Sequence, residues 1–247
     1  MTNLSAILLG LVQGLTEFLP VSSSGHLVIA QSLIPGFSQP GVLFDVILHF
    51  GTLFSVLYFF RGKIFKISFR YLLLLFIGTI PAVLAGFLFR DQLELMFKAT
   101  KWVGLELIIS GFLNLYVDKA KSKKSEVSVK DSVWVGVFQA IAIIPGISRS
   151  GATIFAGVKR GVNKEKVAEF SFLLSVPAIL GANLLEIVSY SGKINGSFSP
   201  YIAGFLAALI SGYVAIKIVY SFLAQNKFKY FAYYCFLVGV LAVVFFR

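Results

Sequence analysis

Long apolar runs alternate with short polar connections along most of the 247-residue chain. Six of these runs are long enough to cross a hydrocarbon core as α-helices, which takes roughly 20 residues each. The six predicted spans are residues 42–60, 71–89, 102–117, 167–190, 200–222 and 230–246. The alternating segments of about ten residues that mark a membrane β-barrel do not occur. The pattern therefore predicts an all-α polytopic membrane protein.

Two further apolar stretches, residues 4–34 and 133–158, are interrupted in the middle by "LPVSSSG" and "IPGISRSG". Proline lacks the N–H that continues a helix, and serine competes for backbone hydrogen bonds. Broken helices persist at membrane depth only where they are buried in protein or line a water-filled cavity. We therefore expect both stretches to be re-entrant helical hairpins.

The two interrupted stretches also match each other. A shift of 126 residues places "GLVQGLTEFLPVSSSGHLVIA" (10–30) on "GVFQAIAIIPGISRSGATIFA" (136–156) without a gap. Six positions are identical, where chance would give roughly one or two. They are Gly10/Gly136, Gln13/Gln139, Ser22/Ser148, Ser24/Ser150, Gly25/Gly151 and Ala30/Ala156.

This match predicts a single membrane domain, 1–247, made of two repeats at about 1–126 and 127–247. Each repeat would hold one re-entrant hairpin and three transmembrane helices. Because three is odd, the second repeat has to be inverted relative to the first. Inverted repeats of this kind place a site where the two broken helices meet.

Composition agrees with a membrane protein, because 13% of the residues are charged, against roughly 25% in soluble domains. The net charge of +11 comes from clusters between the spans, which indicates a positive-inside bias and no nucleic-acid partner. The side that we expect to be cytoplasmic carries Arg61, Lys63, Lys66, Arg70, Lys119, Lys121, Lys123, Lys124, Lys130, Lys159, Arg160, Lys164, Lys166, Lys227 and Lys229, with Lys217 at a span end. The other side carries Arg90, Lys98, Lys101, Lys193 and Arg247. Both termini and the mouth of the first hairpin should then face outward.

The first hairpin carries Gln13 and Glu17, which are four residues apart and share one face of a helix. A carboxylate inside a membrane is costly and marks a functional site by default. The structural alternative is an ion pair, for which Arg149 is the obvious partner.

The turn that follows carries Ser22, Ser23 and Ser24, with His26 three residues beyond Ser23. The serines fit turn and N-cap positions as well as a functional role. A histidine near a hydroxyl is an acid/base partner, although a histidine in an apolar helix also serves as a structural donor.

The second hairpin carries "PGISRSGAT", residues 145–153. Arg149 lies between Ser148 and Ser150, and Thr153 follows one turn later. A guanidinium with hydroxyls and free N–H groups at a helix start suits a phosphate. Together the two hairpins hold the groups of a phosphoryl-transfer site, where positioning and charge stabilisation dominate.

Two other classes of protein compete with an enzyme. A secondary transporter or flippase of a lipid monophosphate has the same architecture and needs the phosphate clamp, but it has no use for a nucleophile. A purely structural membrane protein needs neither of the two matched polar hairpins. The sequence leaves a homo-oligomer open.

"QGLTEFLPVSSSGH" together with "PGISRSGAT" resembles the undecaprenyl-pyrophosphate phosphatase family, the bacitracin-resistance type of integral membrane phosphatase. The resemblance covers essentially the whole chain. It implies hydrolysis of undecaprenyl (polyprenyl) pyrophosphate to the monophosphate and inorganic phosphate, which recycles a carrier lipid for cell-wall synthesis. It further implies a divalent cation, Mg²⁺ or Ca²⁺, a multi-pass protein of the inner or plasma membrane, and an active site that faces the outer side.

Residue roles follow from the same resemblance. Ser23 would be the nucleophile, unless water attacks with Glu17 as base, and Glu17 would be base or metal ligand. His26 would be an accessory acid/base, and Arg149 would bind the pyrophosphate. The substrate-binding set is Gln13, Ser22, Ser24, Ser148, Ser150 and Thr153. Gln13 departs from the commoner pattern, because many members have glutamate there, and an amide binds metal more weakly.

Four remaining polar residues lie in or near the spans. Asp45 and His49 share a face at the start of the first span, where Asp45 assists the cation, orients a site residue or faces water. Glu106 and Glu186 are expected to pair within the bundle, although Glu186 is close enough to a span end to reach water. Cys235 lies in an apolar run, where we expect a small packing residue.

Overall fold

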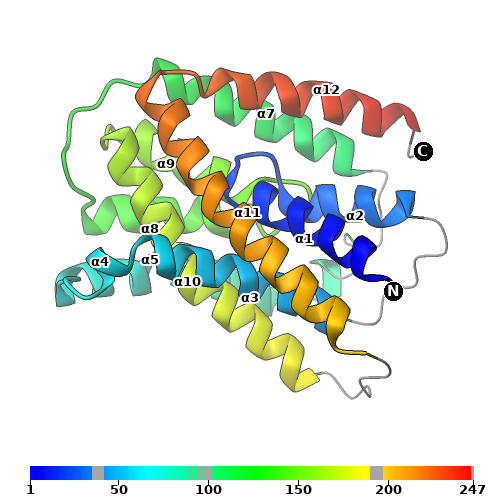
Figure 1. Cartoon of the computed structure of the whole chain (residues 1–247). Coiled ribbons are helices and arrows are strands. Elements are labelled where there is room, and N and C mark those ends of the chain that lie inside the picture. The colour runs from blue at the N-terminus through cyan, green and yellow to red at the C-terminus, as the bar shows by residue number, and fades with distance from the viewer. Residues whose placement is uncertain (35–41, 90, 94–95, 97–101, 190–196, 246–247) are drawn as a thin grey trace.

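The computed structural model describes residues 1–34, 42–89, 91–93, 96, 102–189 and 197–245, and these residues form helices without any β-strand. The only sheet-like pairing in the described residues is an isolated bridge between Lys124 and Val162. The predicted all-α class is therefore confirmed. The arrangement of the helices is shown in Figure 1.

Both interrupted stretches form two helices joined by a turn. The first consists of α1 (Asn3–Phe18) and α2 (Ser23–Leu33), and the second of α8 (Val129–Ile141) and α9 (Arg149–Lys159). In each hairpin a serine caps the second helix, because the Ser22 and Ser148 hydroxyls accept hydrogen bonds from the N–H groups of Gly25 and Gly151. Proline and serine thus end and restart the helices where the sequence predicted.

The six predicted spans all form helices, with bounds within three residues of the expected ones. They are α3 (Val42–Phe59), α5 (Phe69–Leu88), α7 (Val103–Lys119), α10 (Lys164–Ser189), α11 (Ser199–Ala224) and α12 (Lys229–Phe245), and the short α4 (Arg61–Ile64) follows α3. The predicted ends at residues 190 and 246 lie outside the described residues.

Only three of these helices are long and apolar enough to be candidate membrane spans, namely Phe69–Leu88, Lys164–Val188 and Ser199–Ala224. The other three have 17 or 18 residues. At 1.5 Å per residue this is about 26 Å, a little less than a hydrocarbon core of about 30 Å.

Helices from distant parts of the chain pack in pairs. Helix α1 lies along α11, α8 along α5, and α7 along α12 (Figure 1). Glycines allow the close approach, because a Cβ on Gly10 would lie 2.4 Å from the Gly204 carbonyl oxygen, and one on Gly136 would lie 2.5 Å from that of Gly78. Small residues at such contacts are typical of membrane helix pairs.

The outer surface of the bundle is strongly apolar. Large side chains such as Phe76, Phe87 and Leu237 are each more than 60% exposed. Exposed apolar surface on this scale fits contact with lipid rather than with water.

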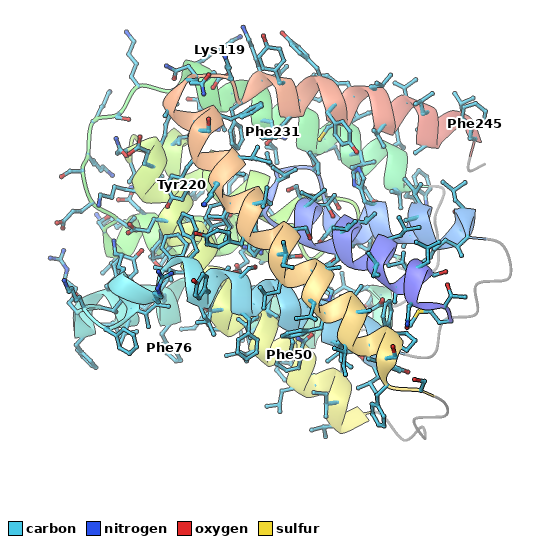
Figure 2. All side chains as sticks on the ribbon, viewed as in Figure 1. Phe50, Phe76, Lys119, Tyr220, Phe231 and Phe245 are labelled. Atoms are coloured by element: carbon cyan, nitrogen blue, oxygen red, sulfur yellow. The ribbon has the colours of Figure 1, made fainter. Side chains whose placement is uncertain are left out.

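Different segments of the chain lie at the two ends of the bundle. The N-terminus and the end of α12 lie at one end, and the loop between α7 and α8 lies at the other (Figure 1). Lys119 and Phe245 mark these opposite ends (Figure 2). The five basic residues expected on the outer side lie outside the described residues.

Candidate active site

The turns of the two hairpins touch inside the bundle. The Ser24 hydroxyl accepts a hydrogen bond from the Gly146 N–H at 3.4 Å, and the Ser150 hydroxyl donates to the Leu19 carbonyl at 3.2 Å. From α7, the Asn114 amide donates to the Pro20 carbonyl at 2.6 Å. The polar residues of both motifs therefore come together, 126 residues apart in the chain.

Glu17 is the centre of this arrangement. Its side chain is buried at the end of α1, and its Oε1 accepts a hydrogen bond from the Arg149 guanidinium at 2.6 Å. Its Oε2 accepts from the Ser23 hydroxyl at 2.8 Å and from the Gln13 amide at 3.0 Å. The ion pair considered from the sequence is formed, and the i,i+4 contact of Gln13 with Glu17 is formed as well.

Packing holds Glu17 in place. Its neighbour Phe18 is fully buried and lies edge-on to Phe172 of α10, with ring centroids 5.5 Å apart. This contact anchors the end of α1, so that the carboxylate does not depend on its polar partners alone for its position.

Arg149 begins α9 and is mostly buried, with a side-chain exposure of 17%. Besides Glu17, its guanidinium donates to the Ser171 carbonyl of α10 at 3.3 Å. The hydrogen bonds to Glu17 and to the Ser171 carbonyl hold the planar guanidinium where the two hairpin turns meet. Its other N–H groups can bind an anion there.

The hydroxyls around Arg149 are turned in different directions. The hydroxyl oxygens of Ser148 and Ser150 are 3.2 Å apart, and both residues are buried. The Thr153 hydroxyl instead donates to the Arg149 carbonyl and lies 2.6 Å from the Ser171 hydroxyl. In this structure Thr153 therefore ties α9 to α10 and does not point into open space.

The three serines of the first hairpin are also not equivalent. Ser22 has a positive φ of 70°, which is rare for a residue other than glycine, and its hydroxyl lies 3.3 Å from that of Ser24. Ser23 alone directs its hydroxyl to Glu17. Strained backbone of this kind is frequent at functional sites.

His26 faces away from Ser23. Its Nδ1 lies 2.8 Å from the Ser22 carbonyl, and its Nε2 lies 2.8 Å from the Tyr234 hydroxyl of α12. The sequence predicted His26 as an acid/base partner near a hydroxyl. The structure pairs it with the hydroxyl of Tyr234, while Ser23 is paired with Glu17.

Asp45 and His49 lie on one face of α3, as predicted. The Asp45 carboxylate accepts a hydrogen bond from Gln31 at 3.3 Å, and the His49 Nδ1 lies 2.8 Å from the Asp45 carbonyl.

The expected pairing of Glu106 and Glu186 within the bundle is not observed. Neither carboxylate has an ion-pair or hydrogen-bond partner among the described residues. Glu186 is exposed, whereas Glu106 is buried against Gly146, whose Cβ position would be 2.4 Å from Glu106 Oε2. Gly146 has a φ of 88°, so this turn requires glycine for two reasons.

Four residues that the sequence analysis did not select complete the surroundings of the site: Ser110, Asn114, Ser171 and Tyr234. Three of them are small polar residues in apolar runs, which is a usable signal because such residues hydrogen-bond between membrane helices. Tyr234 gave no such signal, since tyrosine is common where membrane helices meet the interface.

Oxygen atoms dominate the centre of the site. Gln13 Oε1 is buried, accepts no hydrogen bond from the described residues, and belongs to the residue that contacts Glu17. No group of three or more His, Cys, Asp or Glu side chains lies together within the described part of the chain. Oxygens of this kind suit Mg²⁺ or Ca²⁺, and Mg²⁺ usually takes only one or two protein carboxylates together with phosphate and water.

Comparison with known proteins covers nearly the whole chain. Residues 6–241 match the family described as "Bacitracin resistance protein BacA". The chain is 42% identical to the "Undecaprenyl-diphosphatase" of Carboxydothermus hydrogenoformans over 255 residues, covering 99% of this chain and 97% of the relative. It is 41% identical to "Undecaprenyl-diphosphatase 3" of Bacillus cereus, covering 99% and 97%. It is 37% identical to the "Undecaprenyl-diphosphatase" of Methanosphaera stadtmanae, covering 98% and 97%.

Proposed function

The chain belongs to the bacitracin resistance protein BacA family, and from this membership we propose that it hydrolyses undecaprenyl diphosphate to undecaprenyl phosphate and inorganic phosphate. This reaction recycles the carrier lipid of cell-wall synthesis. The observation that carries the proposal is that Glu17 accepts hydrogen bonds from both Ser23 and Arg149 where the two hairpins touch.

In the first step the Ser23 oxygen attacks the terminal phosphorus, and its proton passes to Glu17, whose Oε2 already accepts that hydrogen bond. The bond between this phosphorus and the bridging oxygen breaks. Undecaprenyl phosphate departs with the proton that Glu17 returns to it.

In the second step water attacks the phosphoserine and gives a proton to Glu17, which is ionised again. The Ser23 oxygen leaves and takes this proton back, and inorganic phosphate is released. Arg149 binds the phosphate oxygens in both steps, with Ser148, Ser150 and Thr153 around it, and Ser22, Ser24 and Gln13 line the other side. His26 would be an accessory acid/base for proton transfers that do not pass through Glu17.

A divalent cation, Mg²⁺ or Ca²⁺, is part of the proposal, and Glu17 with Gln13 Oε1 are the protein oxygens that would hold it. When bound, the cation would neutralise charge on the diphosphate. The protein itself orients Ser23 and fixes Glu17 between Gln13 and Arg149.

Inverted repeats in the inner or plasma membrane complete the proposal. Helices α9 and α12 begin and end 126 residues after α2 and α7, which supports two repeats in one membrane domain. The reciprocal contacts Gly10–Gly204 and Gly136–Gly78 fall at this same offset and support the inversion. The basic loops at one end of the bundle support an active site that opens to the outer side.

The test is phosphate release from a C55 pyrophosphate in detergent, with Mg²⁺ or Ca²⁺ and with EDTA. We expect metal-dependent release by the wild type, a loss of roughly 100-fold or more in Ser23→Ala, and about 1,000-fold in Arg149→Ala. Ser32→Ala is the matched control, because this exposed serine of α2 donates to the Ile29 carbonyl away from the site.

Each contrary result has a distinct meaning. Release that persists in Ser23→Ala would move the attack to water, with Glu17 as its base. A folded wild-type protein that releases no phosphate would overturn the proposal and leave a lipid-phosphate transporter as the function to test.

A further inference from the structure

The side chain of His26, a site residue predicted from the sequence, contacts Tyr234 of α12. Its imidazole Nδ1 and Nε2 lie 2.8 Å from the Ser22 carbonyl and the Tyr234 hydroxyl, respectively. The two rings also stack, with centroids 5.5 Å apart and planes inclined by 14°. Tyr234 therefore determines both where the imidazole lies and how it is turned.

The pattern of hydrogen bonds determines which nitrogen of the neutral ring carries the proton. A backbone carbonyl only accepts hydrogen bonds, so Nδ1 is the donor to Ser22. Nε2 is then the acceptor, and the Tyr234 hydroxyl donates to it. The lone pair of His26 is consequently directed at α12 and not at Ser23.

This direction separates two roles that the sequence placed close together. Ser23 gives its hydrogen bond to Glu17, so the nucleophile has its base without His26. Nε2 remains basic at the opposite edge of the first hairpin turn, where it can serve a proton transfer that does not involve the Ser23 hydroxyl. That second transfer needs an imidazole of fixed tautomer and orientation.

Helix α12 lies where it can fix the orientation of the His26 imidazole. This helix packs along α7. The residue after Tyr234, Cys235, is buried, and its Sγ lies 3.6 Å from the Pro20 carbonyl oxygen. Two successive residues of α12 thus contact the first hairpin, one at its turn and one at His26. Tyr234 itself is 42% exposed, so its ring reaches His26 from the lipid-facing side of the bundle.

We propose that Tyr234 is a positioning residue of the active site. It donates a hydrogen bond to Nε2 of His26 and stacks on the ring, and so holds the imidazole, whose Nδ1–H tautomer is set by the Ser22 carbonyl, in one orientation. The role of this tautomer in turnover rests on the proposed phosphatase function. The contact between Tyr234 and Nε2 does not rest on it, and the two parts can be tested separately.

The test compares Tyr234→Phe with Tyr233→Phe. Both changes remove one phenolic hydroxyl and keep the ring, and both tyrosines are exposed neighbours in α12. Tyr233 packs edge-on to Tyr230 and has no hydrogen bond from its hydroxyl to the described residues, which makes it a matched control.

The first readout is ¹⁵N NMR of protein labelled only at histidine. The chain has two histidines, so in a His49→Gln background all histidine signals come from His26. We expect a protonated Nδ1 and an unprotonated Nε2 in the wild type and in Tyr233→Phe. In Tyr234→Phe the Nδ1–H donated to the Ser22 carbonyl should persist, whereas the Nε2 signal should move toward the shift of an unprotonated imidazole nitrogen that accepts no hydrogen bond.

The second readout is the kinetics of phosphate release. We expect Tyr234→Phe to lower kcat by roughly 10-fold, as loss of an outer partner of a functional histidine commonly does, with KM changed less than about 2-fold. Tyr233→Phe should match the wild type.

The outcomes separate cleanly. If Tyr234→Phe equals Tyr233→Phe in both readouts, the proposal is wrong. A lower kcat with unchanged ¹⁵N shifts would also overturn it, because the hydroxyl would then act elsewhere. If the wild type releases no phosphate, the proposed function fails, while the ¹⁵N spectra still decide whether Tyr234 positions His26.

Discussion

At the scale of single residues, the two carboxylate oxygens of Glu17 have different hydrogen-bond partners. Oε1 pairs with Arg149, while Oε2 accepts from both Gln13 and Ser23. The ion pair keeps the carboxylate charged in a buried place, where an isolated charge would be costly. The charged Oε2 is then available to take a proton from the serine.

Gln13→Glu tests the cation at the same scale. The change puts a second carboxylate beside Glu17, in place of an amide that donates to it at 3.0 Å. We expect the Mg²⁺ or Ca²⁺ concentration for half-maximal activity to fall by about 10-fold, because added ligand charge tightens binding of such ions. Without metal, repulsion between the carboxylates should lower the melting temperature in detergent, and metal should restore it.

Gln139→Glu is the control for this experiment. Gln139 is the matching residue of the second hairpin, and its Oε1 is likewise buried without a hydrogen-bond partner among the described residues. Its amide donates to the Gly78 carbonyl rather than to a carboxylate, so the variant should lose stability and metal should not restore it. Equal metal responses in the two variants would contradict a cation at Gln13 and Glu17.

At the scale of helices, close glycine contacts hold the two hairpins against the spans. A Cβ on Gly10 or Gly136 would lie 2.4 or 2.5 Å from a backbone oxygen of the facing helix. We expect Gly10→Ala and Gly136→Ala each to destabilise the protein by about 1–3 kcal/mol, because the helix pairs must separate. Thermal unfolding in one detergent measures the effect.

Gly86→Ala serves as the comparison for both variants. Gly86 lies in α5, and apart from its chain neighbours and the backbone of its own helix no described atom lies within 4 Å of its Cβ position. Alanine also has the higher helix propensity, so this change should be neutral or slightly stabilising. If Gly10→Ala behaved like Gly86→Ala, tight packing of α1 on α11 would be the wrong account.

Asp131 joins three segments at the end of the bundle that carries the basic loops. Its buried carboxylate accepts hydrogen bonds from Lys124 and Ser128 of the preceding loop and from Arg160 after α9. Burial alone would raise the pKa of this carboxyl, but these hydrogen bonds lower the pKa to about 2. The loop and both arms of the second hairpin are thereby linked.

A pKa below the unfolded value means that Asp131 stabilises the fold when it is ionised. The contribution is complete above about pH 4, the unfolded value, and is lost as the pH falls through about 2. We expect the wild type to exceed Asp131→Asn by about 1–2 kcal/mol at pH 6, with the difference shrinking toward pH 2. Glu126→Gln, at an exposed residue of the same loop, should show no such convergence in thermal unfolding.

At the scale of the whole molecule, the apolar exterior and the separation of the two ends predict one orientation. Lys121 is exposed in the loop before α8, and Ser197 is exposed just before α11. In a Cys235→Ala background, a membrane-impermeant maleimide should label Ser197→Cys on intact cells. It should label Lys121→Cys only after permeabilisation.

The single native cysteine makes this experiment clean. Cys235 is buried and contacts the Pro20 carbonyl, so the unmodified protein should not react. The reverse labelling pattern would place the basic loops outside and would contradict the proposed orientation.

Local chemistry in the sequence determined the helices, the two interruptions and the neighbouring pair of Gln13 and Glu17. Proline and serine end helices whatever surrounds them, and residues four apart always share a helix face. The matched motifs also indicated that the two hairpins belong to one site. The equal offset of α9 from α2 agrees with that reading, although the repeat itself stays a prediction.

Tertiary structure alone decided the partners of each polar group. Arg149 reaches Glu17 across 132 residues, and Tyr234 reaches His26 across 208. Such contacts depend on how whole helices pack, and periodicity only indicates which face a residue occupies, not what that face meets. For this reason the sequence placed His26 near a hydroxyl without showing that the hydroxyl belongs to α12.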